Sequence, residues 1–207
     1  MKNYAKLATR MIVVWFIFVL SASALHLFEN NSNRIGIAVG IASLTPIVVF
    51  FLGFAASENF RRFALSLNPA ILTSAHVWRM IGFIFVLLEA HGILPAIFAL
   101  PAGYGDMAIG ATASFVAWQL ANPVHRNSFI LWQALGIADL VIAVTLGTTA
   151  GLISPQGPST APMTMLPLSL IPTFLVPLFV IFHSICILQA RSWKAAPESI
   201  HQTMSPA

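Results

Sequence analysis

The stretch that decides the fold is residues 35–55, IGIAVGIASLTPIVVFFLGFA, which contains no charged residue. An α-helix rises 1.5 Å per residue, so about 20 apolar residues are enough to cross the roughly 30 Å hydrocarbon core of a bilayer. Five further apolar segments flank this stretch, and the six predicted spans lie at residues 11–28, 35–55, 75–97, 106–122, 129–151 and 165–189. We therefore predict an all-α, polytopic transmembrane helix bundle of six spans.

The composition points to the same class of protein. Hydrophobic residues make up 58% of the chain and charged residues 8%, with a mean hydropathy of +0.86, whereas soluble domains carry roughly 25% charged residues. So few charges cannot cover a water-soluble surface. The connections between the apolar segments are short, so we predict a single transmembrane domain at residues 1–190, followed by a polar cytoplasmic tail at residues 191–207.

The basic residues indicate the orientation of the spans. The formal net charge is +4, but Lys and Arg lie mostly at the ends of the apolar segments, so we interpret the charge as a sign of topology and expect no nucleic-acid partner. Cytoplasmic loops of membrane proteins carry an excess of Lys and Arg. If both termini lie in the cytoplasm, the external loops hold only Arg34, and the cytoplasmic segments hold Lys2, Lys6, Arg10, Arg61, Arg62, Arg126, Arg191 and Lys194. Arg79 falls near the predicted cytoplasmic end of the third span, where we expect its side chain to reach the membrane surface.

Two features leave the number of spans open. Residues 2–24 combine basic residues, an apolar run and small residues, as a cleaved signal peptide does; we favour an uncleaved first span because the apolar character continues to Phe28. The fourth segment is short and follows a predicted turn at residues 101–105, so a re-entrant loop is the alternative to a full crossing. The expected location is the inner (cytoplasmic) membrane of the cell, as a multi-pass protein.

Ionisable residues inside a membrane are costly and therefore mark functional candidates. Glu89, His91, Asp106 and Asp139 are predicted to lie between the midplane and the external surface, beside a passage rich in Gly and Pro at residues 92–105. Kinked backbone and carboxylates can line a polar cavity. We predict that these four residues form a substrate or proton pathway for the binding or transport of a small solute coupled to protons or cations. The alternative is that they only hold helices together.

The histidines suggest a second function. On the third span His76 and His91 face broadly one side at opposite leaflets, His183 can meet His76, and His26 can meet His91. Paired helix histidines ligate haem iron, and this layout resembles that of di-haem b-type membrane cytochromes. Haem b is therefore the alternative to the expectation of no cofactor, and the protein would then be an electron carrier. The spacing of His, Cys, Asp and Glu predicts no metal site.

Two runs resemble a group of small bacterial integral membrane proteins: residues 92–110, GILPAIFALPAGYGDMAIG, and residues 170–183, LIPTFLVPLFVIFH. The resemblance implies no activity. The chain has no Walker loop, nucleophile elbow, HExxH or CxxC motif, so an enzyme is not favoured. A non-catalytic subunit of a membrane assembly is a third hypothesis. The expected partners are the lipid bilayer, a small molecule or proton, and a second copy or other subunits of a membrane complex.

Overall fold

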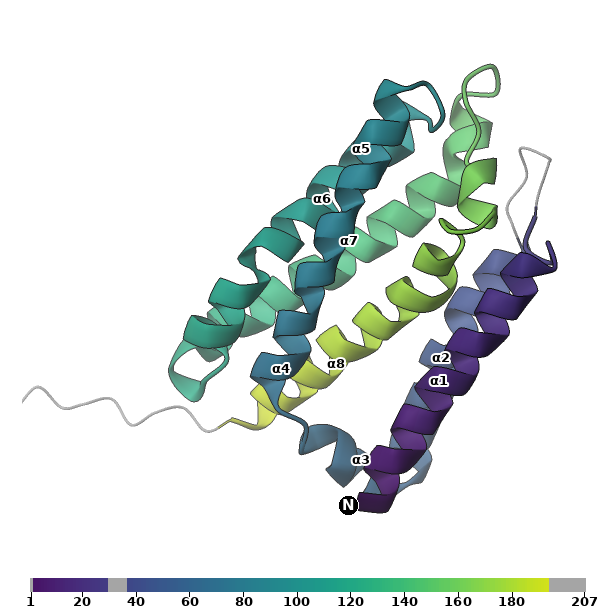
Figure 1. Ribbon diagram of the computed structural model, residues 1–207. Helices are drawn as coiled ribbons and strands as arrows, with labels where there is room; N and C mark the ends of the chain where they lie inside the picture. Colours follow the sequence, from purple (N-terminus) through teal and green to yellow (C-terminus); the bar gives the residue numbers. More distant parts are fainter. Residues whose placement is uncertain (1, 30–36, 194–207) are drawn as a thin grey trace, which may run out of the picture.

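The computed structural model describes residues 2–29 and 37–193. Within these two ranges the chain forms helices joined by short turns and contains no β-strand. The long helices run roughly along one axis, as Figure 1 shows. The prediction of an all-helical fold is therefore confirmed.

The first half of the chain supplies two long helices, a short surface helix and a composite span. These elements are α1 (Lys2–Ala24), α2 (Ile37–Ala56), α3 (Glu58–Leu65), α4 (Pro69–Ser74), the 3-10 helix η1 (Ala75–Gly82) and α5 (Phe83–Ala90). The last three follow one another without a break, so α4, η1 and α5 make one continuous helical segment.

The second half of the chain contains three long helical segments, two of which include π-helical turns. Its elements are α6 (Ala96–Phe115), the π-helix η2 (Val116–Leu120), the 3-10 helix η3 (Pro123–His125), α7 (Arg126–Ile153), the 3-10 helix η4 (Ala161–Thr164), the π-helix η5 (Ile171–Leu175) and α8 (Val176–Ser192).

Five helical segments of the described residues are long and apolar enough to cross a membrane: 4–24, 37–56, 69–90, 123–153 and 171–192. The helix α6 is not among them, because Pro101, Tyr104 and Asp106 lower its hydropathy. It nevertheless runs beside α5 and α7 for most of their length (Figure 1). The structure thus contains several helices long and apolar enough to cross a membrane, as expected of a helical membrane protein.

The third segment begins six residues earlier than its hydropathy predicts. Asn68 caps α4 by accepting hydrogen bonds from the backbone N–H groups of Ala70 and Ile71, and Pro69 occupies the first helical position, which suits a residue without an N–H group. The segment ends at Ala90, before Gly92 with φ +69°. Arg79 therefore lies halfway along a helix of residues 69–90, and not near its end.

The fourth segment also begins earlier than predicted. The turn expected at residues 101–105 is wrong, because α6 starts at Ala96 and continues through Pro101. A proline inside a helix removes one backbone hydrogen bond. Here Ala99, Ala102 and Gly103 are buried on either side of it, so packing outweighs the loss.

Most of the basic residues gather at one end of the bundle, which we call the basic end. Figure 1 places the start of α1, the helix α3, the α6–α7 turn and the end of α8 there. The contacts agree: Nε of Arg126 donates a hydrogen bond to the carbonyl of Ala190 over 2.9 Å, and the Tyr4 ring stacks on Phe63 with centroids 6.2 Å apart. The start of α1 and the end of α8 therefore lie at the same end of the bundle.

Candidate functional site

The composite span presents its polar residues with a period of three. Thr73, His76, Arg79, Gly82 and Phe85 are all buried. A 3-10 helix has three residues per turn, so side chains at i and i+3 lie directly above one another. The 3-10 winding of η1 therefore aims His76 and Arg79 in the same direction, into the interior of the bundle.

Arg79 is the centre of a buried ion-pair cluster. Its Nε donates a hydrogen bond of 2.7 Å to Oδ1 of Asp106 on α6, and a terminal nitrogen donates to Oδ2 of Asp139 on α7. A further bond of 3.2 Å reaches the carbonyl of Gly136. The side chain of Arg79 is 0% exposed, so the expectation that it reaches the membrane surface is wrong. The cause is the early start of the helix, which places Arg79 at mid-span.

Arg79, Asp106 and Asp139 together form what we call the charge cluster, and its charges do not balance. One guanidinium faces two carboxylates, so the three groups as full ions sum to −1. An unbalanced buried charge is costly in a low-dielectric interior. A bound proton or a small cation would neutralise it. The carboxylates are 11% and 16% exposed, so they are the accessible part of the cluster.

A chain of hydrogen bonds extends from the charge cluster toward α4. Arg79 donates to Nε2 of His183 over 3.3 Å, and Nδ1 of His183 lies 2.5 Å from Oε1 of Gln133. The amide of Gln133 donates to Oγ1 of Thr73 over 2.9 Å. Because a guanidinium can only donate, Nε2 of His183 is the acceptor and Nδ1 carries the proton. Gln133 thereby fixes the tautomer and the orientation of the His183 ring.

His76 lies beside this chain without joining it. Its ring stacks on His183 with centroids 3.8 Å apart and an interplanar angle of 21°. The neighbouring rings are those of Trp132, Phe179 and Phe182. Both ring nitrogens of His76 are buried and have no hydrogen-bond partner among the residues that the structure describes, a cost that a folded protein rarely accepts.

The stacked histidines do not fit a bis-histidine haem. A porphyrin lies between its two axial ligands, whereas the rings of His76 and His183 are in direct contact. Both nitrogens of His183 are also engaged, by Arg79 and Gln133. The redox hypothesis therefore finds no support in this geometry.

Glycines allow the helices to come close enough for these contacts. A Cβ atom at Gly105 would overlap Oδ1 of Asp139, and one at Gly136 would overlap the ring of His183. At Gly110 it would lie 2.7 Å from the backbone nitrogen of Met80. Small residues let helix backbones approach each other in membranes, so here they position the charged side chains.

The structure separates the four residues of the predicted pathway. Asp106 and Asp139 meet through Arg79, but Glu89 and His91 lie at the far end of α5. Glu89 is ten residues beyond Arg79, about 15 Å along a helix axis. His91 is exposed, and its Nδ1 lies 2.8 Å from the carbonyl of Leu87.

His26 and His91 lie apart from each other. His26 is exposed and pairs with Glu29 at the end of α1, whereas α1 and α5 lie on opposite sides of the bundle in Figure 1. In the parts of the chain that the structure describes, no three His, Cys, Asp or Glu side chains are close enough to hold a metal ion.

Sequence reasoning missed Arg79, Gln133 and Thr73 as parts of the site. The signal that could have found Arg79 is the spacing of three from Thr73 to Phe85, which no α-helical periodicity explains. Gln133 stands six residues before Asp139 on α7 and joins the site through His183.

The long apolar helices and the ion pairs in their midst define a class: helical membrane proteins with a polar interior site. Within that class the chain belongs to the family described as Domain of unknown function (DUF8737), whose model matches residues 37–191. The match includes every residue of the charge cluster and leaves α1 outside. No curated protein and no solved structure matches the chain.

Proposed function

We propose that this protein is a proton-coupled carrier of a small solute, with the charge cluster as its coupling site. One observation carries the proposal: a fully buried guanidinium lies between two carboxylates that it cannot both neutralise. Intramembrane carboxylates of this kind mark proton and ion pathways in transporters. The proposed location is the inner membrane of a bacterium.

The proposal includes six crossings with the basic end in the cytoplasm. The composite segment α6–η2 comprises residues 96–120. The helical segments before and after it in the chain are long and apolar enough to cross a membrane. The carboxylate of α6–η2, Asp106, faces the interior and pairs with Arg79, so the cost of this charge is offset by a partner. The basic end suits the cytoplasmic side because cytoplasmic segments are rich in Lys and Arg.

The carboxylate of Asp139 is the proposed proton acceptor. It is the more exposed of the two carboxylates, and Arg79 retains Asp106 as a partner when Asp139 is protonated. Protonation replaces a charge-assisted hydrogen bond with a weaker one and so loosens α7 from η1. Arg79 itself lies in the 3-10 helix η1, and such irregular windings often mark hinges.

Infrared difference spectroscopy of the protein in lipid bilayers tests the proton site without knowledge of the solute. On acidification we expect a protonated-carboxyl band that Asp139→Asn removes. The matched control is Glu58→Gln, which changes an exposed carboxylate paired with Arg62 on α3 and should leave that band in place. Glu89→Gln discriminates further: the geometry predicts that the band survives, whereas the pathway predicted from sequence would include Glu89.

Everted membrane vesicles provide the test of transport. A pH-sensitive dye reports proton efflux when members of a solute panel are added. We expect at least one solute to drive efflux with the wild-type protein and with Glu58→Gln, but not with Asp139→Asn. Equal efflux from the wild type and Asp139→Asn would refute the assignment of the coupling site.

A non-catalytic assembly subunit is the second candidate. The observation in its favour is that Arg79, His183, Gln133 and Thr73 are already linked by hydrogen bonds, as expected of a network that only holds helices together. Such a subunit should remain with a fixed partner in mild detergent. Purification of a lone, monodisperse protein would count against this role.

A further inference from the structure

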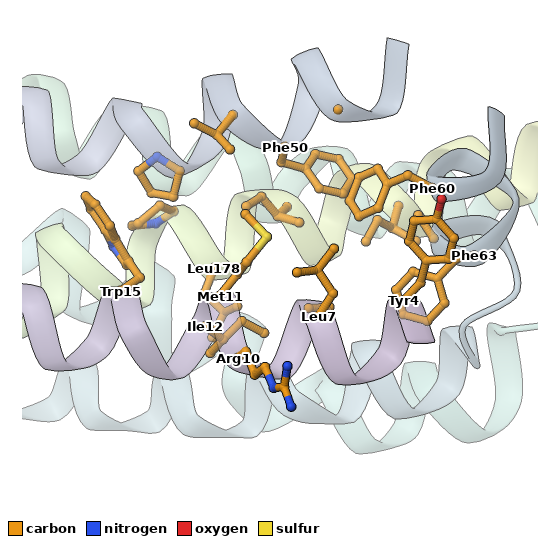
Figure 2. Close-up of a pocket in the computed structure, with 18 of the residues that line it drawn as sticks. Tyr4, Leu7, Arg10, Met11, Ile12, Trp15, Phe50, Phe60, Phe63 and Leu178 are labelled. Carbon is orange, nitrogen blue, oxygen red and sulfur yellow. The ribbon is translucent and has the colours of Figure 1, made fainter. Parts of the chain in front are cut away.

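A second feature lies far from the charge cluster: an apolar slot between α1 on one side and α2, α3 and α8 on the other. Its volume is about 740 Å³. Figure 2 shows the side chains that line it, among them Leu7, Met11, Trp15, Phe50 and Leu178. On α1, Tyr4, Leu7, Met11 and Trp15 recur every three or four residues and form the middle of the wall, and their neighbours on the helix widen it.

Aromatic residues mark the two ends of the slot. At the basic end the Tyr4 ring lies against Phe60 and Phe63, with centroids 6.5 and 6.2 Å apart. At the other end Nε1 of Trp15 donates a hydrogen bond of 3.1 Å to the carbonyl of Thr173. Beyond Trp15 the helix packs tightly, through the buried side chains of Val19 and Ala22. The slot is therefore bounded and is not a general gap between loosely packed helices.

The length of the slot matches one leaflet of a bilayer. Tyr4 and Trp15 are eleven residues apart on α1, which corresponds to about 16 Å along the helix. Half of a hydrocarbon core of about 30 Å is about 15 Å. An acyl chain that enters at the basic end would fill the slot and reach Trp15 near the middle of the membrane.

The charges around the slot favour a negative headgroup. Arg10 lines the slot with its stem, and Figure 2 shows its guanidinium extending away from Phe50, out of the apolar space. Lys6 precedes it by one helical turn, and Arg61 lies on α3. Basic residues beside a membrane surface attract anionic lipids by about 1 kcal/mol each.

We propose that the slot is a binding site for one acyl chain of an anionic phospholipid from the leaflet at the basic end, with the side chain of Arg10 reaching out of the slot toward the headgroup. This site is independent of the proposed transport function. It would make the position of α1, which lies outside the family match, dependent on a lipid held between α1 and the rest of the bundle.

Native mass spectrometry of the full chain in detergent tests the site, with phosphatidylglycerol and phosphatidylcholine of equal chain length as probes. The wild type should retain one phosphatidylglycerol in preference to phosphatidylcholine. Ala8→Trp and Met11→Trp fill the slot and should abolish retention, whereas Val13→Trp should not, because Val13 is exposed on α1 and does not line the slot. Circular dichroism verifies that each variant is folded.

The charge is tested separately. Arg10→Gln should lower the preference for phosphatidylglycerol about fivefold, and Arg191→Gln, a change at the same end but away from the slot, should leave it unchanged. Equal binding of the two lipids by the wild type would overturn the anionic assignment. Undiminished retention by folded Ala8→Trp or Met11→Trp would overturn the site, as would a dimer that those variants dissociate, since a second copy would then occupy the slot.

Discussion

The two halves of the bundle differ in their interiors, since one contains charged side chains and the other an apolar space. Around η1, α6, α7 and α8, glycines bring backbones together and the interior holds Arg79 with its carboxylates. Around α1 and α2, aromatic and aliphatic side chains enclose an apolar space of about 740 Å³. The difference teaches that close packing here serves the polar residues: charges need nearby partners, whereas an apolar slot inside a membrane can be filled by lipid.

The largest expected effect is the loss of the central cation. Arg79→Gln leaves Asp106 and Asp139 buried without their counter-ion and should lower the free energy of unfolding by about 3–5 kcal/mol. Titration with a denaturing detergent measures it. Arg62→Gln is the control, because its pair with Glu58 is exposed, at 71% and 62%, and should contribute at most about 1 kcal/mol. Similar losses in both variants would contradict a special role for burial.

A smaller effect is expected where helices touch. Gly136→Ala places a methyl group in the ring of His183, and such overpacking typically costs about 1–3 kcal/mol. Gly40→Ala on α2 meets no atom within 4 Å, so it should be neutral or stabilise its helix by up to about 1 kcal/mol. The thermal unfolding midpoint should therefore fall clearly for Gly136→Ala and stay the same or rise slightly for Gly40→Ala.

The hydrogen-bond chain should contribute less to the free energy of unfolding than the close packing at Gly136. Gln133→Leu removes the partner of both His183 and Thr73 and should cost about 1 kcal/mol, the upper range for hydrogen bonds between membrane helices. Gln119→Leu, at an exposed position of η2, is the matched control. A destabilisation as large as that of Arg79→Gln would show that the chain, and not the charge cluster, holds the interior together.

The smallest effect is expected in the slot. Ala8→Trp should change the free energy of unfolding by less than about 0.5 kcal/mol, because the added ring enters existing space. Ala102→Trp, at a fully packed position of α6, should cost well over 1 kcal/mol. If Ala8→Trp were equally harmful, the slot would be as tightly packed as the polar half.

Hydropathy was sufficient for the helices whose whole length is apolar. Residues 35–55 were predicted and α2 runs from Ile37 to Ala56. The third helix begins six residues earlier than predicted because Asn68 and Pro69 form its first turn. The prediction rests on the apolar run that starts at residue 75 and does not use this capping signal. Because of this error of six residues, the prediction places Arg79 near the membrane surface. In the structure Arg79 lies at mid-span, at the centre of the site.

The sequence predicts each carboxylate of the site as an intramembrane residue, but it does not predict that the two lie close together. Asp106 and Asp139 stand out as intramembrane ions, yet their pairing depends on Gly82 and Gly105, where an added Cβ atom would overlap Asp106 and Asp139 respectively. These glycines matter only once η1, α6 and α7 are placed together. Glu89 and His91 looked equivalent to the two aspartates in sequence. Glu89 lies in the last turn of α5, ten residues beyond Arg79, and His91 follows the end of that helix. Their part in a pathway stays a prediction.

The 3-10 winding of η1 also determines how far the third span reaches. A 3-10 helix rises about 2.0 Å per residue and turns 120°, against 1.5 Å and 100° in an α-helix. Rewinding Ala75–Gly82 into α-helix would therefore draw α5 about 4 Å toward α4 and rotate it by about 160° relative to α4. If a change in hydrogen bonding around Arg79 rewound this segment, α5 would therefore shift along its axis and rotate as one unit. The movement would extend to the membrane surface opposite the basic end.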